Sequence, residues 1–237
     1  MEQAGTGRTK DALIVFARVP EPGRVKTRLI PYLTAEEAAD LYAAFLRDAL
    51  DQYLALGVAV RLYLAPPEGA MLPGWIPPAV DRFEQRGEDL GARMRRAFLE
   101  TFVAGYERVV IIGTDHPTLP TAFIAQAFAA LETPRTVVLG PSEDGGYYLL
   151  GMNEFYPEAF HEMTYSHDRV FVDTLARLAE TPAVPVILPP WYDVDTPEAL
   201  RRLRDDLDTS AEGCLHTRRV LARLGRSGRR PGGILGE

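Results

Sequence analysis

The chain has 237 residues, a hydrophobic content of 46% and a net charge of -7, as expected of one large soluble α/β domain or at most two small ones. The acidic balance argues against general binding to nucleic-acid backbones, which requires a basic face, but it allows one bound nucleotide. The single cysteine, Cys214, excludes an intramolecular disulfide and a multi-cysteine zinc site.

No stretch approaches the ~20 apolar residues that span a bilayer, and the first eleven residues lack the apolar segment of a secretory signal. We therefore expect a cytoplasmic protein with neither a membrane nor a nucleic acid as its partner. Residues 1–11 are expected to form a flexible lead-in, 12–208 one domain, and 209–237 a short helix with a mobile tail.

Apolar runs and helical periodicity alternate along the chain, beginning with a buried strand at 12–17. Thr34 is expected to cap a helix that begins at Ala35. Further strands are expected at 58–64, 108–113, 136–140, 147–151 and 184–188, a loop at 66–78, and further helices at about 90–102, 121–131, 168–179, from Thr196 and at 215–224. This alternation predicts a doubly wound, mostly parallel sheet with helices on both faces.

Charged residues gather at the ends of the predicted strands, where open α/β sheets bind ligands. The loop after the first strand contains Gly23 and four cations, which are Arg18, Arg24, Lys26 and Arg28. Glycine allows close approach of the backbone, and the cations suit a pyrophosphate. The loop is not a Walker A motif, because lysine does not directly follow glycine. A solvated charge run is the alternative, but the prolines and the glycine favour a site, with Lys26 as its strongest candidate.

Asp115 comes two residues after the strand predicted at 108–113, a place where a hard cation with oxygen ligands is held. An aspartate that caps the next helix is the alternative. Its neighbour His116 is expected to have a local packing or hydrogen-bonding role. The acidic segments downstream favour metal binding over helix capping as the role of Asp115.

Asp193 and Asp195 lie two residues apart, on the same side of an extended segment. Two close carboxylates repel each other unless a cation or hydrogen-bond donors offset them, so a metal is a natural partner. Capping of the following helix explains Asp195 equally well, but it does not explain Asp193.

Two further segments have candidate roles. In the turn at 143–147, Asp144 could accept hydrogen bonds from sugar hydroxyls or act as a base, with Gly145, Gly146 and Tyr147 against the substrate; a plain hairpin turn is the alternative. The segment at 85–94 joins a strand-like stretch to the start of the helix at 90. In it, Gln85 could read a nucleobase edge through its amide and Gly91 could lie at an anion site. A polar loop capped by Asp89 is the alternative.

Five ordered motifs resemble a bacterial family of glycosyltransferase-like proteins, formerly grouped as a domain of unknown function and also labelled arsenosugar-biosynthesis-type glycosyltransferases. They cover about residues 12 to 224 and read Phe16-Ala17-Arg18-x-Pro20-x-Pro22-Gly23-x-Val25-Lys26-Thr27-Arg28-Leu29, Asp89-Leu90-Gly91-x-Arg93-Met94, Gly113-x-Asp115-x-Pro117-x-Leu119, Gly140-Pro141-x-x-Asp144-Gly145-Gly146-Tyr147-Tyr148 and Asp193-Val194-Asp195-Thr196.

The resemblance implies the GT-A nucleotide-diphospho-sugar transferase fold, which sugar and cofactor nucleotidyltransferases share. It implies that Asp115, with Asp193 or Asp195, holds a metal, and that Lys26 and Arg28 face the phosphates. Where the family usually has an aromatic-Ser-Thr segment, this chain has Tyr165-Ser166-His167, so the resemblance does not assign the contacts to the acceptor.

Together these expectations describe a transferase that depends on Mg²⁺ or Mn²⁺ and uses a nucleotide or nucleotide-sugar. We favour a glycosyltransferase with a small-molecule acceptor, in which the metal stabilises the leaving diphosphate and Asp144 orients the sugar or acceptor. The alternative is a nucleotidyltransferase that acts on a phosphorylated small molecule with an NTP, where Lys26 and Arg28 would stabilise the leaving pyrophosphate. A catalytically inactive nucleotide-binding protein is the third hypothesis.

Overall fold

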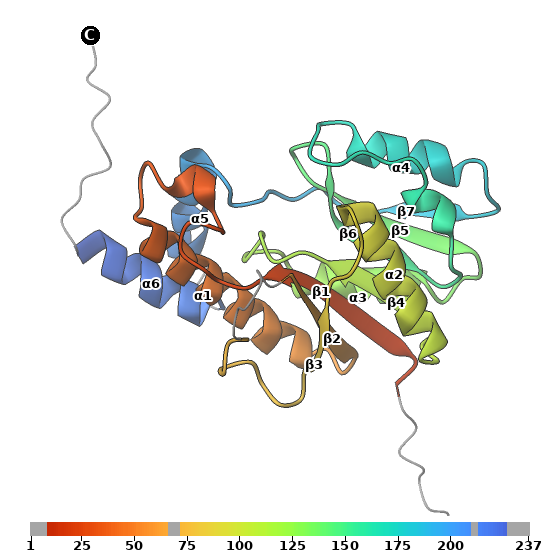
Figure 1. Ribbon diagram of the computed structural model, residues 1–237, viewed down its shortest axis with the longest axis horizontal. Helices are drawn as coiled ribbons and strands as arrows, with labels where there is room; N and C mark the ends of the chain where they lie inside the picture. Colours follow the sequence, from red (N-terminus) through yellow and green to blue (C-terminus); the bar gives the residue numbers. More distant parts are fainter. Residues whose placement is uncertain (1–8, 66–71, 210–212, 227–237) are drawn as a thin grey trace, which may run out of the picture.

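A seven-stranded sheet lies between two layers of helices in the computed structural model, which describes residues 9–65, 72–209 and 213–226 (Figure 1). The strands are β1 (Asp11–Arg18), β2 (Ala59–Ala65), β3 (Asp81–Glu84), β4 (Arg108–Ile112), β5 (Thr136–Pro141), β6 (Tyr147–Met152) and β7 (Val184–Ile187). The helices are η1 (Thr27–Leu29), α1 (Ala35–Leu54), α2 (Leu90–Val103), α3 (Thr121–Ala130), η2 (Pro157–Phe160), α4 (Val170–Leu178), α5 (Pro197–Thr209) and α6 (Leu215–Arg226).

The strand order is β3-β2-β1-β4-β6-β5-β7, and among the described strands only β6 runs against the others. The prediction of a doubly wound, mostly parallel sheet is therefore confirmed. Because β1 pairs in parallel with both β2 and β4, the loops that follow these strands leave the sheet at the same edge. We call this edge, where β1, β2, β3 and β4 end, the carboxyl edge.

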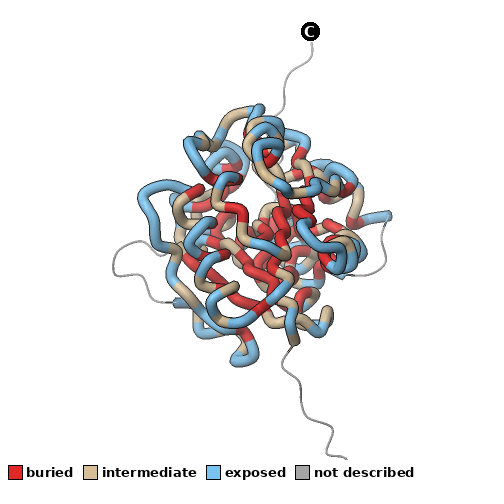
Figure 2. The backbone as a smooth tube through the Cα atoms, turned by 90° about the vertical axis from the view of Figure 1, so that its right-hand side faces the viewer, coloured by how far each residue is buried: buried red, intermediate tan, exposed pale blue. Residues whose placement is uncertain are grey.

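Side chains that alternate along β1 divide the core between the two faces of the sheet. Leu13 and Val15 belong to the cluster that includes residues of α1 and α3, whereas Ala12 and Ile14 belong to the cluster that includes residues of α2, η2 and α4. The buried backbone forms the centre of the molecule, with exposed segments around it (Figure 2). Burial on both faces explains why β1 is a continuous apolar run.

The start of α1 follows the sequence prediction. Thr34 Oγ1 accepts a hydrogen bond from the backbone N–H of Glu37 at 3.1 Å, and the Glu37 carboxylate accepts one from the backbone N–H of Thr34 at 2.8 Å. This capping box fixes where α1 begins after the loop that follows β1. We call that loop, which contains Gly23, Arg24, Lys26 and Arg28, together with Arg18 at the end of β1, the basic loop. The loop predicted at 66–78 is described only from residue 72, and in it Ile76 is buried.

At both ends of the predicted domain, described residues of the adjoining segments pack against it. Asp11, which the prediction assigns to the lead-in, is the first residue of β1 and pairs with Arg108. The helix α6, which the prediction places after the domain, packs along α1 and completes a core cluster with α1, η1 and α5. The rest of the predicted lead-in and the predicted tail from residue 227 lie outside the described residues.

Of the shortest described elements, η1 and η2 have no counterpart among the predicted helices and strands, and β3 corresponds to the strand-like stretch expected before Gln85. They are short, with three, four and four residues, and β3 has no buried residue. Only Phe83 of β3 is partly buried, so this strand at the edge of the sheet has no hydrophobic alternation to reveal it.

Candidate functional site

Lys26 lies at the centre of the carboxyl edge, with its side chain only 2% exposed. It has a left-handed backbone conformation (φ 48°) at the start of η1. Its ammonium lies 2.5 Å from Asp115 Oδ1 and 2.7 Å from Asp195 Oδ1, and it also lies over the rings of Tyr42 and Phe45. The structure thus joins the basic loop to two acidic segments that are far away in the sequence.

The charge state of Lys26 follows from these neighbours. Burial by itself would lower its pKa, but the charges of Asp115 and Asp195 outweigh that effect and hold the pKa above its ordinary value. The ammonium is therefore a fixed positive charge between two carboxylates that are 43% and 40% exposed.

A backbone hydrogen bond sets the distance between the acidic segments. The N–H of Val194 donates to the carbonyl oxygen of Asp115 at 2.7 Å, and the side chain of Val194 is fully buried. Asp195 can therefore reach the same ammonium as Asp115.

Asp193 has other partners. Its Oδ2 accepts a hydrogen bond from Ser142 Oγ at 2.9 Å, and its Oδ1 lies 3.6 Å from Nδ1 of the buried His116. The His116 ring packs against Tyr148, with 5.6 Å between the ring centroids. The packing role expected for His116 is thus consistent with its surroundings. Asp193 has no contact with Lys26 among those found in the described part of the chain.

Tyr42 is a site residue that the sequence analysis did not identify. Its hydroxyl accepts hydrogen bonds from the backbone N–H of Arg18 at 2.9 Å and from Thr114 Oγ1 at 3.0 Å, so it links the ends of β1 and β4. Burial, followed by the charge of Asp115, raises its pKa to about 12. In the sequence Tyr42 is one more apolar position of α1, and nothing there indicates the role of its hydroxyl.

The remaining cations of the basic loop are exposed. Arg24 pairs with Glu21 at 3.4 Å, and an N–H of Arg18 donates to the backbone oxygen of Arg24 at 3.4 Å. Within the described ranges, the guanidinium of Arg28 has no hydrogen bond or ion pair. Gly23 has a φ of +76° and open space where a Cβ would be, as close approach of a ligand requires.

The turn at 143–147, which we call the acidic turn, packs against the segment that precedes α4. Asp144 is exposed, and its Oδ1 accepts a hydrogen bond from the backbone N–H of Gly146 at 3.0 Å. A Cβ on Gly145, which has a φ of +89°, would lie 2.0 Å from the carbonyl oxygen of Asp168. The close approach that the glycine permits is therefore made by the protein's own backbone.

Gln85 and Gly91 lie near the start of α2. The Gln85 side-chain amide donates to the carbonyl oxygens of Ala17 at 3.0 Å and Tyr63 at 2.9 Å, at the ends of β1 and β2. A Cβ on Gly91 would lie 2.7 Å from the ring of Tyr165, so packing alone accounts for this glycine. Tyr147 is partly buried and its hydroxyl donates to Met94 Sδ at 3.9 Å.

The donor set at the carboxyl edge bears on the expected metal. Mg²⁺ is commonly held by one or two carboxylates together with substrate phosphates. Asp115 and Asp195 meet that description, because one oxygen of each already faces the same cation and both side chains are open to solvent. Within the described ranges, no group of three or more His, Cys, Asp or Glu side chains is arranged to hold a metal. The expected metal would therefore need oxygen atoms of the substrate as further ligands.

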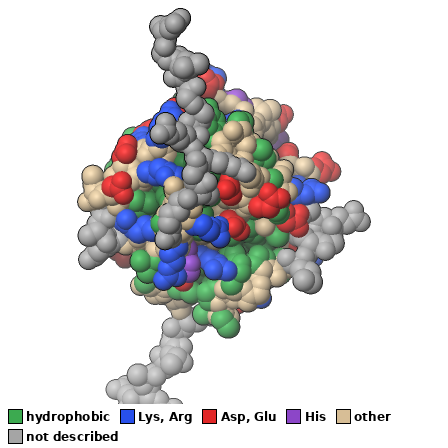
Figure 3. All heavy atoms as spheres, turned by 90° about the vertical axis from the view of Figure 1, so that its left-hand side faces the viewer, with side chains coloured by type: hydrophobic (Ala, Val, Ile, Leu, Met, Phe, Trp, Pro, Cys, Tyr) green, Lys and Arg blue, Asp and Glu red, His purple; other side chains and the backbone are tan. Residues whose placement is uncertain are grey.

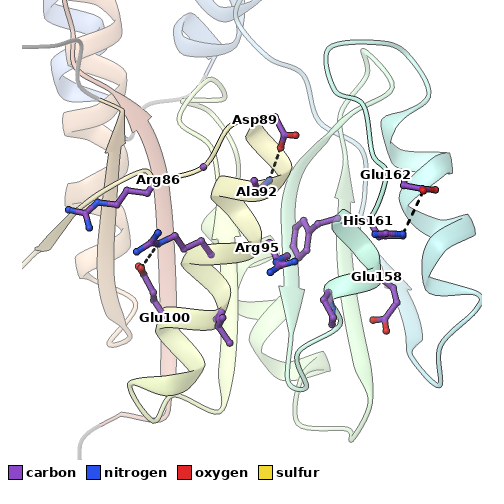
Figure 4. A pocket seen from close by; sticks show the side chains of 13 residues that line it. Arg86, Asp89, Ala92, Arg95, Glu100, Glu158, His161 and Glu162 are labelled. Carbon is purple, nitrogen blue, oxygen red and sulfur yellow. Dashed lines mark hydrogen bonds and ion pairs between the residues drawn. The ribbon is translucent and has the colours of Figure 1, made fainter.

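A hollow of about 930 Å³ lies between α2 and η2. Charged side chains from both elements line it (Figure 4), and several of them satisfy one another. Arg96 pairs with Glu100 at 2.7 Å, His161 lies 3.9 Å from Glu162, and Asp89 caps α2 through the N–H of Ala92.

On the face shown in Figure 3, basic and acidic side chains lie close to one another, with apolar side chains between and below them. As for membranes, no helix within the described ranges combines the length and the apolar character needed to cross one.

The family model described as "Uncharacterized protein conserved in bacteria (DUF2064)" matches residues 49–167. A crystal structure of a Desulfovibrio desulfuricans G20 protein, provisionally classed as a nucleotide-diphospho-sugar transferase, is 30% identical with a TM-score of 0.84 and covers 92% of this chain and 98% of that chain. A search of curated proteins found no match to the sequence.

Two more distant structures share the fold. One is 4-diphosphocytidyl-2C-methyl-D-erythritol synthase, at 11% identity and a TM-score of 0.55, covering 85% of this chain and 100% of that chain. The other is a cytidylyltransferase from Leptospira borgpetersenii serovar Hardjo-bovis, at 12% identity and a TM-score of 0.54, covering 93% and 95%. The fold is thus that of the nucleotide-diphospho-sugar transferases, and this chain belongs to the bacterial DUF2064 family.

Proposed function

We propose that this protein is a metal-dependent glycosyltransferase that uses a nucleotide-sugar donor and a small-molecule acceptor. The observation that carries the proposal is the Lys26 ammonium held between Asp115 and Asp195 at the carboxyl edge, because open α/β sheets bind ligands at that edge. The relative classed as a nucleotide-diphospho-sugar transferase, which matches nearly the whole chain, supports this choice.

The donor's diphosphate is proposed to lie between the basic loop and the two carboxylates. Arg18 and Arg28, both exposed, would contact its oxygens, and Gly23 would let the backbone approach them. Asp115 and Asp195 would hold Mg²⁺ or Mn²⁺, which supplies Lewis-acid stabilisation of the leaving diphosphate. Asp195 is preferred to Asp193, because the oxygens of Asp193 face Ser142 and His116.

Lys26 is proposed to act as a fixed charge. With two of its three N–H groups directed at Asp115 and Asp195, it keeps both carboxylates in place and offsets their repulsion of an incoming diphosphate. A positive charge that is already positioned requires no reorganisation as negative charge develops on the leaving group.

The sugar or the acceptor hydroxyl is proposed to lie against the turn at 144–147. One carboxylate oxygen of Asp144 accepts from Gly146 N–H, and the exposed side chain can accept a hydroxyl proton with the other. Gly145, Gly146 and Tyr147 would form the adjacent wall.

Nucleotidyl transfer is the second candidate, and the exposed cations favour it. A triphosphate carries more charge than a diphosphate, and Arg18, Arg24 and Arg28 exceed the needs of a nucleotide-sugar. In that reaction a substrate phosphate would attack the α-phosphorus of an NTP, and Lys26 and Arg28 would stabilise the pyrophosphate that leaves. A protein that binds nucleotide without catalysis is the third candidate.

A thermal-shift panel of NTPs and nucleotide-sugars, each with manganese and with a chelator, separates the candidates. We expect one nucleotide-sugar to raise Tm, since a ligand that binds the folded state stabilises it. We expect the chelator to abolish this stabilisation. Stabilisation by an NTP and by no nucleotide-sugar would replace glycosyl transfer with nucleotidyl transfer. Equal shifts with and without metal would favour binding without catalysis, and no shift at all would contradict every nucleotide reading.

A further inference from the structure

The orientation of the Gln85 amide is fixed by its partners. Both hydrogen bonds of Nε2 go to backbone carbonyl oxygens, those of Ala17 and Tyr63. A carbonyl oxygen only accepts, so the NH₂ group must face these two atoms and the amide oxygen must face away from them. The backbone N–H of Gln85, which donates to the carbonyl oxygen of Leu64 at 2.8 Å, holds the residue at the end of β2.

The amide oxygen is left open. Oε1 of Gln85 accepts no hydrogen bond from any residue that the structure describes, and it is not among the buried polar atoms that lack a partner. Gln85 therefore presents one hydrogen-bond acceptor and no donor to a ligand at the carboxyl edge.

A chain of contacts connects Gln85 to the lysine and its carboxylates. Ala17, whose carbonyl oxygen binds the amide, precedes Arg18, whose N–H binds the hydroxyl of Tyr42. That hydroxyl binds Thr114, the residue before Asp115. Gln85 and the proposed diphosphate site thus belong to one continuous edge of the sheet.

We propose that Gln85 selects a nucleobase with an exocyclic amino group and disfavours the oxo counterpart of that base. The inference rests on the proposed nucleotide-dependent function and names the class of base. An amino group of cytosine, adenine or guanine donates to Oε1, whereas a base carbonyl would bring a second acceptor against it. Uracil has one ring N–H, but it lies between two carbonyl oxygens. Repulsion of the wrong base adds to attraction of the right one.

The test measures Kd by calorimetry, with manganese, for nucleoside diphosphates in which an amino group is replaced by an oxo group: CDP against UDP and ADP against IDP. We expect the amino member of at least one pair to bind about tenfold more tightly or better, the discrimination typical of a single well-placed contact to a base edge. This ratio of the two Kd values is measured on the wild-type protein alone.

Two variants then identify the source of the ratio. Gln85→Lys retains donors for the carbonyl oxygens of Ala17 and Tyr63 but lacks the acceptor. Its added positive charge affects the binding of both diphosphates of a pair equally, so it does not change their ratio of Kd values. The ratio should fall to about one in Gln85→Lys and stay unchanged in Arg86→Ala, a control at the neighbouring exposed residue.

The outcomes separate this inference from the proposed function. Tight binding of both members of every pair with equal Kd would overturn the selection by Gln85 and leave the nucleotide site in place. A wild-type ratio that persists in Gln85→Lys would also overturn it. Absence of binding by every diphosphate would overturn the proposed function and this inference with it.

Discussion

Lys26 is the residue on which the candidate site depends. It adopts a left-handed backbone conformation, is buried, and faces two carboxylates, an arrangement that the surrounding structure must enforce. Because its pKa is raised above the ordinary value, its contribution to stability is fully present below about pH 10.5. That contribution is lost only as the pH rises through the higher pKa of the folded state.

Replacing Lys26 by Met tests this arrangement, since Met retains an apolar chain of similar length. We expect Lys26→Met to lower the free energy of unfolding by about 1–2 kcal/mol, less than for a fully buried pair because Asp115 and Asp195 are partly exposed. Urea denaturation gives this difference, which should be constant between about pH 6 and pH 9. Added Mg²⁺ should stabilise the variant more than the wild type. An unchanged midpoint would argue against a structural charge at Lys26.

The sequence identifies Lys26 as a candidate but does not reveal its partners. Lys26 and Asp195 are 169 residues apart, and only the parallel pairing of β1 with β4 and the hydrogen bond from Val194 to Asp115 bring them together. In the proposed site Asp195 is preferred to Asp193, because the oxygens of Asp193 face Ser142 and His116. Spacing alone cannot give such distances.

At the scale of elements, α6 shows how a single carboxylate attaches one helix to another. Asp48, a buried residue of α1, accepts hydrogen bonds from the backbone N–H groups of His216 at 2.9 Å and Thr217 at 2.8 Å. These are N–H groups of the first turn, which have no partner within the helix. Asp48 thus caps α6 from outside and fixes it against α1.

Asp48→Ala is expected to lower the free energy of unfolding by about 1–2 kcal/mol, as for the loss of an N-cap. Because α6 would lose protection first, hydrogen exchange should increase in α6 before it does in the sheet. Asp51→Ala is the matched control: its side chain is 62% exposed and lies 3.3 Å from His216, so it should change stability by less than about 0.5 kcal/mol. Equal effects of the two variants would contradict the capping role.

Elements with strong periodicity are predictable here, but their packing is not. Buried strands such as β1 and the amphipathic helix α1 follow from the order of apolar residues. The helix α6 is also predicted, yet its place in the core is not, because periodicity shows that a helix has an apolar face without showing what covers it.

At the scale of the whole molecule, the sheet topology makes the site. The loop after β1, the loop after β4 and the segment that leads into α5 all meet at the carboxyl edge, and Gln85 borders it from the end of β3. The acidic turn between β5 and β6 is joined to Asp193 through Ser142. The fold could be predicted from alternating strands and helices, whereas the reaction depends on ligands that the fold alone does not specify.

The central claim is that Asp115 serves a metal-dependent nucleotide site, and calorimetry tests it most directly. The nucleotide that stabilises the protein best would be titrated into wild type, Asp115→Ala and Asp173→Ala, each with manganese and with a chelator. Asp173, 38% exposed and 3.7 Å from Arg169, is a control of similar exposure outside the site. We predict that Asp115→Ala stays folded but binds at least about tenfold more weakly in manganese, with Asp173→Ala unchanged. Wild-type affinity of Asp115→Ala in manganese would contradict the account.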